Sequence, residues 1–342
     1  MEVESIGSFH IGGGPVTLSG LPPRRMRLTP SAPERAFPSD GEYETGQMYV
    51  QYVHLIRPRA RYPLLLWHGG GMTGATWESK PDGGAGWQSF FLNAGHDVYV
   101  SDAMERGRAG WSRFPEIYTG EPHFRSKREA WELFRFGPDG SWDADPAARR
   151  AFPGQLFPVA VFDRFCKQMV PRWAGHEDAT QAAYDALVRR VGPCVIMTHS
   201  QSGHFGFTAA AHAPDLVRAV IAVEPSGAPL GVEPSGAPLG VEPSGAGPSG
   251  APPDVDTVAL RAIPHLFVLG DYIGQSPFWG GLMPAIEGYR DALTGSGGTA
   301  DWLDLPARGI GGNSHFPMMD RNSDQVAGLI QDWMERHGLM AD

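Results

Sequence analysis

The chain has 342 residues, of which 42% are hydrophobic, and its formal net charge at pH 7 is −10. This apolar fraction can bury one large core, and the acidic balance argues against a nucleic-acid or anionic-membrane surface, which would need a basic patch. No apolar run reaches the roughly eighteen residues that a membrane-spanning helix needs, and the N-terminus lacks the basic and apolar regions of a signal peptide. These features leave two compartments open: the cytoplasm, or an exported location for a mature form.

Strand-like and helix-like patterns alternate along most of the chain. The first forty residues are rich in Gly, Pro and Arg, and we expect an irregular arm there with one short strand at 8–11. Apolar or alternating runs then predict strands at 47–56, 62–67, 97–101, 194–198, 217–223, 265–269 and 302–305. Helical patterns lie between them, at 86–93, 178–190, from after HSQSG to Ala211, 284–293 and 324–337. This order predicts parallel βαβ units in a doubly wound sheet, which is an α/β fold.

Two segments stand outside this alternation, and we expect both to belong to a single domain that spans 1–342. Residues 103–175 are dense in Trp, Phe, Arg and Pro and predict a cap-like insertion over the carboxyl edge of the sheet, with a core formed by Trp111, Trp131, Phe134 and Phe136. In 223–252 the nonapeptide VEPSGAPLG occurs twice and then degenerately. This is too few units for a solenoid, and the Pro and Gly content predicts a surface loop.

The segment CVIMTHSQSGHFGF places Ser200 where a buried strand runs directly into a helix. That context is typical of a nucleophile elbow, a tight turn that raises a serine hydroxyl above the sheet edge. The turn requires small residues two positions before and after the nucleophile, and Thr198 and Ser202 stand there instead of the usual glycines. If Ser202 were the nucleophile, the large His204 would take a flanking position. The alternative is that Ser200 merely caps the helix.

The run HGGGMTG at 68–74 follows the strand predicted at 62–67. A glycine loop at this place lets backbone N–H groups point at a developing oxyanion, and the partner donor is the amide after the nucleophile. Gly70 and Gln201 are therefore the candidate oxyanion-hole residues. The sequence lacks the GK[ST] of a phosphate-binding loop and the spacing of a dinucleotide fingerprint.

A serine hydroxyl needs a general base, which in this fold is a histidine on a loop after the last strand. His315, in GGNSHFP, has that position, whereas His212, His265 and His337 stand in helices or before a strand. Its neutral form would be the base, so we expect activity to rise with pH near the ordinary histidine value of about 6.5. The histidines and the two cysteines lack metal-site spacing, so we expect neither a metal nor a cofactor.

The acid that orients the histidine has two candidates. Asp271 follows the strand at 265–269 and holds the position that most α/β-hydrolases use. Glu224 directly follows the strand at 217–223, one strand earlier, and its extra methylene could span the added distance. The repeat supplies Glu233 and Glu242 as further copies that no buried strand precedes. The residues alone do not separate Glu224 from Asp271.

Segment 68–102, Glu105 to Arg108, the HSQSG elbow, the VEP that follows the next strand, and GNSHFPM together resemble a small group of bacterial α/β-hydrolase esterases whose founding member is an Alcaligenes esterase. The resemblance implies a triad of Ser200, Glu224 and His315, carboxylic-ester hydrolysis, a homodimer and an often exported enzyme. One departure concerns the oxyanion loop, where the founding enzyme has two adjacent, disulfide-bonded cysteines and this chain has Gly70 and Gly71.

The sequence therefore predicts a carboxylic-ester hydrolase that acts on a small-molecule ester through an acyl-enzyme. An amidase, thioesterase or acyltransferase would use the same triad. A relative that binds a small molecule without catalysis is the alternative from another class. We expect Asp102 to brace a nearby loop and Arg106 and Arg108 to be solvated or ion-paired rather than to bind an anionic substrate.

Overall fold

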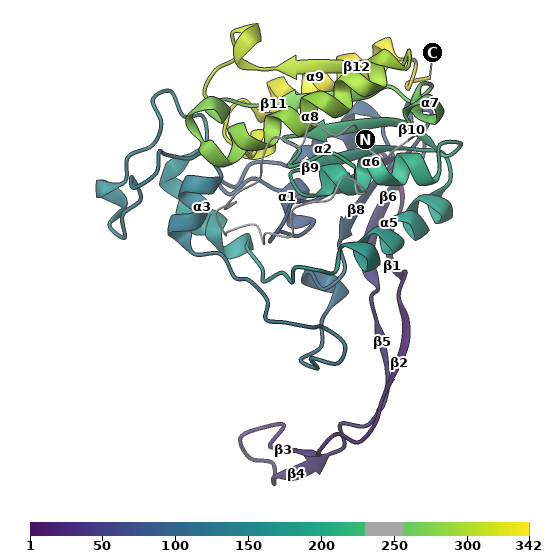
Figure 1. Ribbon diagram of the computed structural model, residues 1–342, viewed down its shortest axis with the longest axis vertical. Helices are drawn as coiled ribbons and strands as arrows, with labels where there is room; N and C mark the ends of the chain where they lie inside the picture. Colours follow the sequence, from purple (N-terminus) through teal and green to yellow (C-terminus); the bar gives the residue numbers. More distant parts are fainter. Residues whose placement is uncertain (230–255, 342) are drawn as a thin grey trace.

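The computed structural model describes residues 1–229 and 256–341 (Figure 1). Its centre is an eight-stranded sheet with the strand order β1-β6-β8-β7-β9-β10-β11-β12. From β8 to β12 all neighbouring strands are parallel, whereas β1 and β6 add antiparallel pairings at one edge. The bounds are β1 Val3–Ile11, β6 Met48–Leu55, β7 Leu64–Trp67, β8 Val98–Asp102, β9 Cys194–His199, β10 Val217–Val223, β11 His265–Leu269 and β12 Ala300–Asp304.

Helices cover both faces of the sheet, so the parallel strands are buried on both sides. In β7, Leu64 and Leu66 face one core, with α2 and α9, whereas Leu65 and Trp67 face the other, with α5, α6 and α8. The helices are α1 Ala75–Glu78, α2 Trp87–Ala94, α3 Lys127–Leu133, α4 Phe162–Phe165, α5 Glu177–Val191, α6 Ser202–His212, α7 Thr257–Leu260, α8 Pro277–Gly295 and α9 Ser323–Arg336. This is the predicted α/β architecture.

The N-terminal forty residues are more ordered than the sequence predicts. Strand β1 extends over nine residues and pairs with β6. Beyond it, two small antiparallel sheets, β2 Gly14–Leu18 with β5 Gly41–Thr45 and β3 Arg24–Met26 with β4 Arg35–Phe37, project from the main body (Figure 1). The prediction of an irregular arm is therefore wrong. The strands escaped notice because most side chains of a narrow two-stranded ribbon are exposed, so its sequence lacks the alternation of apolar and polar residues that marks a half-buried strand.

Helix α8 also begins earlier than predicted, at Pro277 rather than at Pro284. Ser276 caps it, with its side chain 3.5 Å from the amide of Trp279, and Pro277 occupies the first turn, where its missing N–H costs nothing. Pro284 lies inside the helix. The prediction started the helix at Pro284 and therefore missed the cap at Ser276, eight residues upstream.

The chain between β8 and α5 contributes no strand to the main sheet among its described residues, and it contains α3 and α4. Trp131, Phe134 and Phe136 are buried there, but Trp111 is 56% exposed, so its predicted place in a core is wrong. Most of the VEPSGAPLG repeat, from residue 230 onward, lies outside the described residues.

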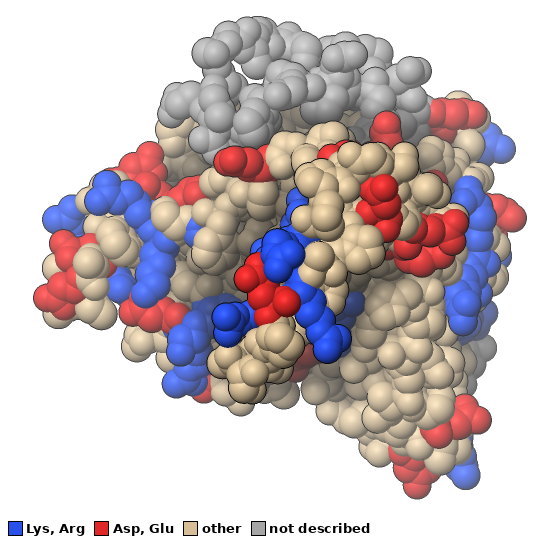
Figure 2. All heavy atoms as spheres, turned by 90° about the horizontal axis from the view of Figure 1, so that it is seen from below, with Lys and Arg blue, Asp and Glu red and all other residues tan. Residues whose placement is uncertain are grey.

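Acidic and basic side chains are interspersed over the face of the molecule shown in Figure 2. Both cysteines, Cys166 and Cys194, are buried and unpaired. In the part of the chain that is described, no helix combines the length and apolar character needed to cross a bilayer.

Candidate active site

Ser200 lies at a sharp turn between the buried strand β9 and helix α6. Its φ is +55°, in the left-handed region that a residue with a side chain rarely adopts. The turn is held on both sides, because the Ser200 amide donates to the carbonyl of Val223 and the Ser200 carbonyl accepts from the amides of Gly203 and Ser226. This strand–turn–helix geometry is the one that presents a nucleophilic hydroxyl above a sheet edge.

The two small residues on either side of this turn have specific neighbours. The buried hydroxyl of Ser202 lies 2.9 Å from the carbonyl oxygen of Trp67, to which it donates, and 3.0 Å from the amide of His199, from which it accepts. Thr198 is larger than the usual glycine, and a methyl group added at Gly206 would lie 2.6 Å from its Cγ2. Helix α6 thus supplies a glycine that makes room for Thr198, while Ser202 holds the turn.

The glycine loop after β7 passes directly against the turn. A methyl group added at Gly69 would lie 2.9 Å from Cβ of Ser200, so the close approach depends on glycine. The amides of Gly70 and Gln201 form no hydrogen bond with any described residue. Two unpaired N–H groups beside a serine hydroxyl are suited to hold an oxyanion.

His315 and Glu224 come together at the carboxyl edge of the sheet although 91 residues separate them. Nδ1 of His315 lies 3.0 Å from Oε2 of Glu224, and both side chains are buried. The other carboxylate oxygen of Glu224 accepts a hydrogen bond from the amide of Gly270. A carboxylate on Nδ1 fixes the tautomer that leaves Nε2 free to accept a proton.

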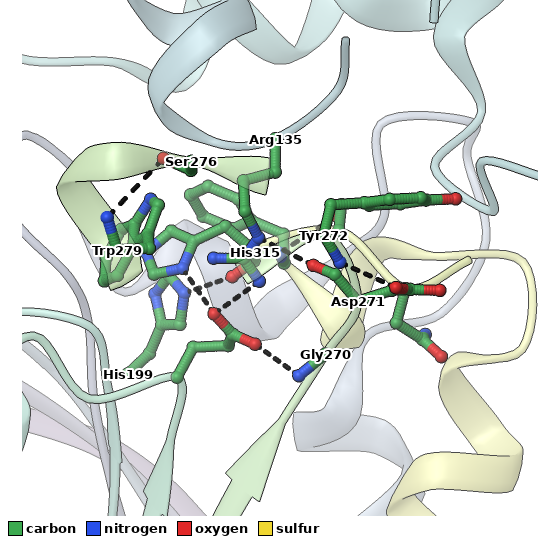
Figure 3. Close-up of polar contacts among 12 residues, drawn as sticks. Arg135, His199, Gly270, Asp271, Tyr272, Ser276, Trp279 and His315 are labelled. Carbon is green, nitrogen blue, oxygen red and sulfur yellow. Dashed lines mark hydrogen bonds and ion pairs between the residues drawn. The ribbon is translucent and has the colours of Figure 1, made fainter. Parts of the chain in front are cut away.

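Arg135, which the sequence did not single out, reaches the same carboxylate from the 103–175 segment, and Figure 3 shows Arg135 beside His315. Its Nη2 lies 2.7 Å from Oε2 of Glu224, and its Nε donates to the carbonyl of Asp271 at 2.8 Å. Arg135 is fully buried and has a φ of +56°. A carboxylate removed from water needs a partner of this kind, since an isolated buried charge is strongly unfavourable.

Aromatic rings enclose the imidazole of His315. Its ring centroid lies 5.7 Å from that of Phe134, which is nearly parallel to it, and 4.1 Å from that of Trp279. Burial lowers the pKa of His315 well below its ordinary value, and the charges of Arg135 and Arg125 act in the same direction. Nε2 of His315 has no hydrogen-bond partner among the described residues, so its lone pair is available.

His199 immediately precedes the turn and holds the backbone of His315. Its Nε2 lies 2.7 Å from the carbonyl oxygen of His315, and burial lowers the pKa of His199 well below its ordinary value, so a neutral ring donates this bond. No hydrogen bond joins Ser200 to His315 in this structure. Such bonds are often long before a substrate binds.

Asp271, the alternative acid, contacts backbone groups instead of the imidazole. Its Oδ2 accepts from the amide of Gly312 and its Oδ1 from the amide of Tyr272, each at 2.7 Å. Its own amide donates to the carbonyl of Asn313 at 2.8 Å. The structure therefore brings Glu224 to His315 and uses Asp271 to hold the loop that carries the histidine.

Asp320 supports that loop from the other side, and the sequence gave no sign of it. One carboxylate oxygen accepts from the Ser314 amide at 2.8 Å and from Nδ2 of Asn313 at 2.9 Å, and the other accepts from the Ser314 hydroxyl at 2.8 Å. Burial raises the pKa of Asp320 to about 7. Asp271 and Asp320 thus hold successive residues of the chain leading to His315.

The chain is similar to two known proteins over most of its length. It is 30% identical over 337 residues to the probable secreted lipase phiG of a fungus (Fungal sp., strain ATCC 74256), which covers 86% of this chain and 88% of that protein. It also matches the structure of a bacterial esterase with a TM-score of 0.77 and 33% identity, over 98% of this chain and 96% of that one. No protein-family model matches the chain.

This chain is an α/β hydrolase of the esterase and lipase family. The family resemblance and the fold class predicted from the sequence are therefore confirmed, and the relatives place the hydrolase among enzymes of ester hydrolysis.

Two arginines of the hydrolase near the site are ion-paired, as the sequence predicts. Nη1 of Arg106 lies 2.8 Å from Oε1 of Glu105, and Nε of Arg108 lies 2.8 Å from Oδ2 of Asp102. Asp102 also accepts from the amide of Gly74 at 2.7 Å, so it braces the end of the glycine loop. Both arginines are therefore paired with carboxylates of the protein itself.

The three histidines that fit the role of general base less well, His212, His265 and His337, form contacts elsewhere in the fold. His265 is buried at the start of β11, with its Nδ1 against the carbonyl of Ile263 at 2.8 Å. His212 pairs with Asp185 and His337 with Asp301. Among residues 1–229 and 256–341, no group of three or more His, Cys, Asp and Glu side chains could hold a metal ion.

Two cavities of the hydrolase adjoin the candidate site. One, of about 20 Å³, borders Gly69, Gln201 and Trp173 and has room for a single water molecule. The other, of about 310 Å³, opens beside Asp271 and Tyr272 at the carboxyl ends of β11 and β12. The candidate catalytic residues and these cavities therefore lie at the same carboxyl edge of the sheet.

Proposed function

We propose that this hydrolase is a serine carboxylic-ester hydrolase in which Ser200, His315 and Glu224 form a catalytic triad. The observation that carries the proposal is the 3.0 Å contact between Nδ1 of His315 and Oε2 of Glu224, while Nε2 of the same ring is unpaired. Ser200 adds a second support, since its left-handed turn is otherwise unfavourable for a serine. The order Ser, Glu, His along the chain is also the order of this fold.

In the proposed reaction, Oγ of Ser200 attacks the ester carbonyl while Nε2 of His315 takes its proton. Glu224 accepts the Nδ1–H bond and stabilises the imidazolium that forms. The amides of Gly70 and Gln201 donate to the oxyanion, His315 returns the proton to the departing alcohol, and the acyl group remains on the serine. Water, activated by the same histidine, then releases the acid.

The remaining parts of the proposal concern substrate access and assembly. The 103–175 segment serves as a cap for a small-molecule ester, which is supported by Arg135 reaching Glu224 from this segment. The homodimer follows from the resemblance to the bacterial esterases. Its test is the mass of the protein in solution.

A fluorophosphonate probe tests the nucleophile, because it reacts with an activated serine whatever the ester. We expect labelling of one site in the wild-type protein, on the peptide that contains Ser200. Ser200→Ala should abolish labelling and lower ester turnover by several orders of magnitude.

Ser202→Ala is the matched control, two residues further along the same elbow. It removes hydrogen bonds that hold the turn and should lower the free energy of unfolding by about 1–2 kcal/mol, but it should retain labelling. Labelling that persists in Ser200→Ala and disappears in Ser202→Ala would reverse the assignment. A wild-type protein that does not react at all would favour a non-catalytic relative.

A further inference from the structure

Arg172 carries a positive charge to the oxyanion loop. A methyl group added at Gly70 would lie 2.8 Å from Nη1 of Arg172 and 2.8 Å from Oε1 of Gln201. Gly70 and Gln201 are the residues whose amides are unpaired beside Ser200. The guanidinium therefore lies next to the place where the ester carbonyl binds in the proposed reaction.

The backbone around Arg172 is fixed by contacts at each of four consecutive residues. The amide of Val170 donates to the carbonyl of Gly71 at 2.9 Å, and the carbonyl of Pro171 accepts from Arg106. Arg172 exchanges two backbone hydrogen bonds with His123, and the amide of the next residue donates to Glu105. A side chain on such a segment starts from a defined position, as a binding residue needs.

The buried arginines of the 103–175 segment fall into two groups. Arg106, Arg125 and Arg135 each form an ion pair with a carboxylate. Arg172 is only 5% exposed, yet it forms no ion pair with the described residues and its Nη1 has no hydrogen-bond partner there. A buried guanidinium nitrogen without a partner is costly, and such atoms in native proteins call for a specific explanation.

The groups around Arg172 do not supply the missing partner. Burial lowers the pKa of Arg172, and the charges of Glu177 and Glu105 only partly oppose this shift. Neither carboxylate forms an ion pair with Arg172, and Glu105 is bonded to Arg106 and His176. On the side of α6, Nε2 of His204 is also buried without a partner among the described residues. Burial and the charge of Arg172 lower the pKa of His204 to about 3, so its ring is neutral and can donate a hydrogen bond.

We propose that Arg172 binds a carboxylate of the substrate, so that the preferred esters carry an anionic group within a few bonds of the scissile carbonyl. This inference rests on the proposed ester hydrolysis and names the substrate class of that site. Guanidinium–carboxylate hydrogen bonds are strong and directional, and a buried arginine keeps its charge.

Two pairs of matched esters test the inference. Monomethyl succinate and methyl pentanoate differ by a carboxylate on the acyl side, whereas acetoxyacetate and propyl acetate differ by one on the alcohol side. Hydrolysis is followed by proton release at a pH where the carboxylates are ionised. We expect the wild-type enzyme to have the higher kcat/KM for the anionic member of at least one pair, and that pair identifies the side that faces Arg172.

Arg172→Gln should lower this preference, the ratio of the two kcat/KM values, by roughly ten- to a hundredfold. Arg172→Lys should retain part of it, because the charge remains while the planar donor set is lost. Arg128→Gln removes the same charge from an exposed position on α3 and should leave the ratio as in the wild type. The ratio of kcat/KM values measured for the wild-type enzyme tests the inference even if a variant does not fold.

Two results would overturn the inference. The wild-type enzyme could favour the neutral ester in both pairs, or Arg172→Gln could slow both members of a pair equally, which would make Arg172 a donor to the oxyanion common to all esters. In either case neutral esters are still hydrolysed. Failure of the proposed function looks different, because then neither pair is hydrolysed and the fluorophosphonate does not label Ser200.

Discussion

The carboxyl ends of β10 and β11 are neighbouring regions with similar chemistry and different roles. The two strands are parallel and in register from Val220 with His265 to Val223 with Val268, and each is followed by a carboxylate at the same edge. The carboxylate of Glu224 contacts His315, whereas the carboxylate of Asp271 accepts hydrogen bonds from the backbone amides of Gly312 and Tyr272. Position after a strand is therefore not enough to identify a catalytic acid.

The difference arises from what the two backbones do after their strands end. Glu224 has a φ of +52°, and its amide still donates to the carbonyl of Val268 at 2.8 Å. The chain at Asp271 has already left the sheet, and its amide and carboxylate bind Asn313 and Gly312 in the loop that leads to the histidine. One carboxylate is thus available to the imidazole, and the other fixes the loop.

The largest effect that separates the two regions is expected for Glu224→Gln. Glutamine keeps the size of the side chain but removes the charge that stabilises the imidazolium, so kcat should fall about 10³- to 10⁴-fold. Steady-state turnover of a simple ester measures this. Glu233→Gln and Glu242→Gln make the same change in the other repeats and should have little effect.

Because Glu224→Gln also leaves Arg135 buried without its anion, the single variant should unfold more easily. The double variant Glu224→Gln with Arg135→Met removes both charges and keeps the turnover test valid if the single variant is unstable. Turnover close to that of the wild type in a folded Glu224→Gln protein would remove Glu224 from the triad.

The second-largest effect is expected on the pH dependence of kcat when Arg135 is changed. Arg135 contacts both regions, because it pairs with the carboxylate of Glu224 and donates to the carbonyl of Asp271. Burial lowers the pKa of His315, and the charges of Arg135 and Arg125 act in the same direction. The neutral base therefore persists to lower pH, and the acid limb of kcat should lie below the ordinary value of about 6.5.

Arg135→Met removes one positive charge beside the imidazole, so the pKa of His315 should rise and the acid limb should move to higher pH. Arg135→Lys keeps the charge and should move it less. The pH profile of kcat measures the limb, and a limb that stays in place in Arg135→Met would show that the arginine does not act on His315.

The smallest effect is expected for Asp271→Asn. Asparagine has a single acceptor oxygen, so it can keep the hydrogen bond from the amide of Gly312 or that from Tyr272 but not both. The other contacts of the loop should still hold it, so kcat should fall only a few-fold. The free energy of unfolding should drop by about 1–2 kcal/mol, because one hydrogen bond is lost and the other loses its ionic character. Denaturant unfolding and turnover check both numbers. A defect as severe as that of Glu224→Gln would reverse the comparison.

Much of the fold followed from local sequence patterns. Buried strands such as 217–223 and the helices between them were predicted to within a few residues, since hydrophobic period and turn residues act over short distances. The elbow at Ser200, the glycine loop and the loop of His315 were found in the same way, because each is a short segment with its own backbone requirement.

Contacts between distant segments were decided by the tertiary structure. Residues alone left Glu224 and Asp271 equal, and the family resemblance, rather than any local pattern, favoured Glu224. Arg135, Asp320 and Arg172 had no sequence signal, because an arginine or aspartate that will be buried has the same local pattern as one that will be solvated. Removal from water makes these charged side chains costly unless they find a partner, and this is why their contacts matter. Which side chains are removed from water depends on how distant segments pack, and no short stretch of sequence encodes that.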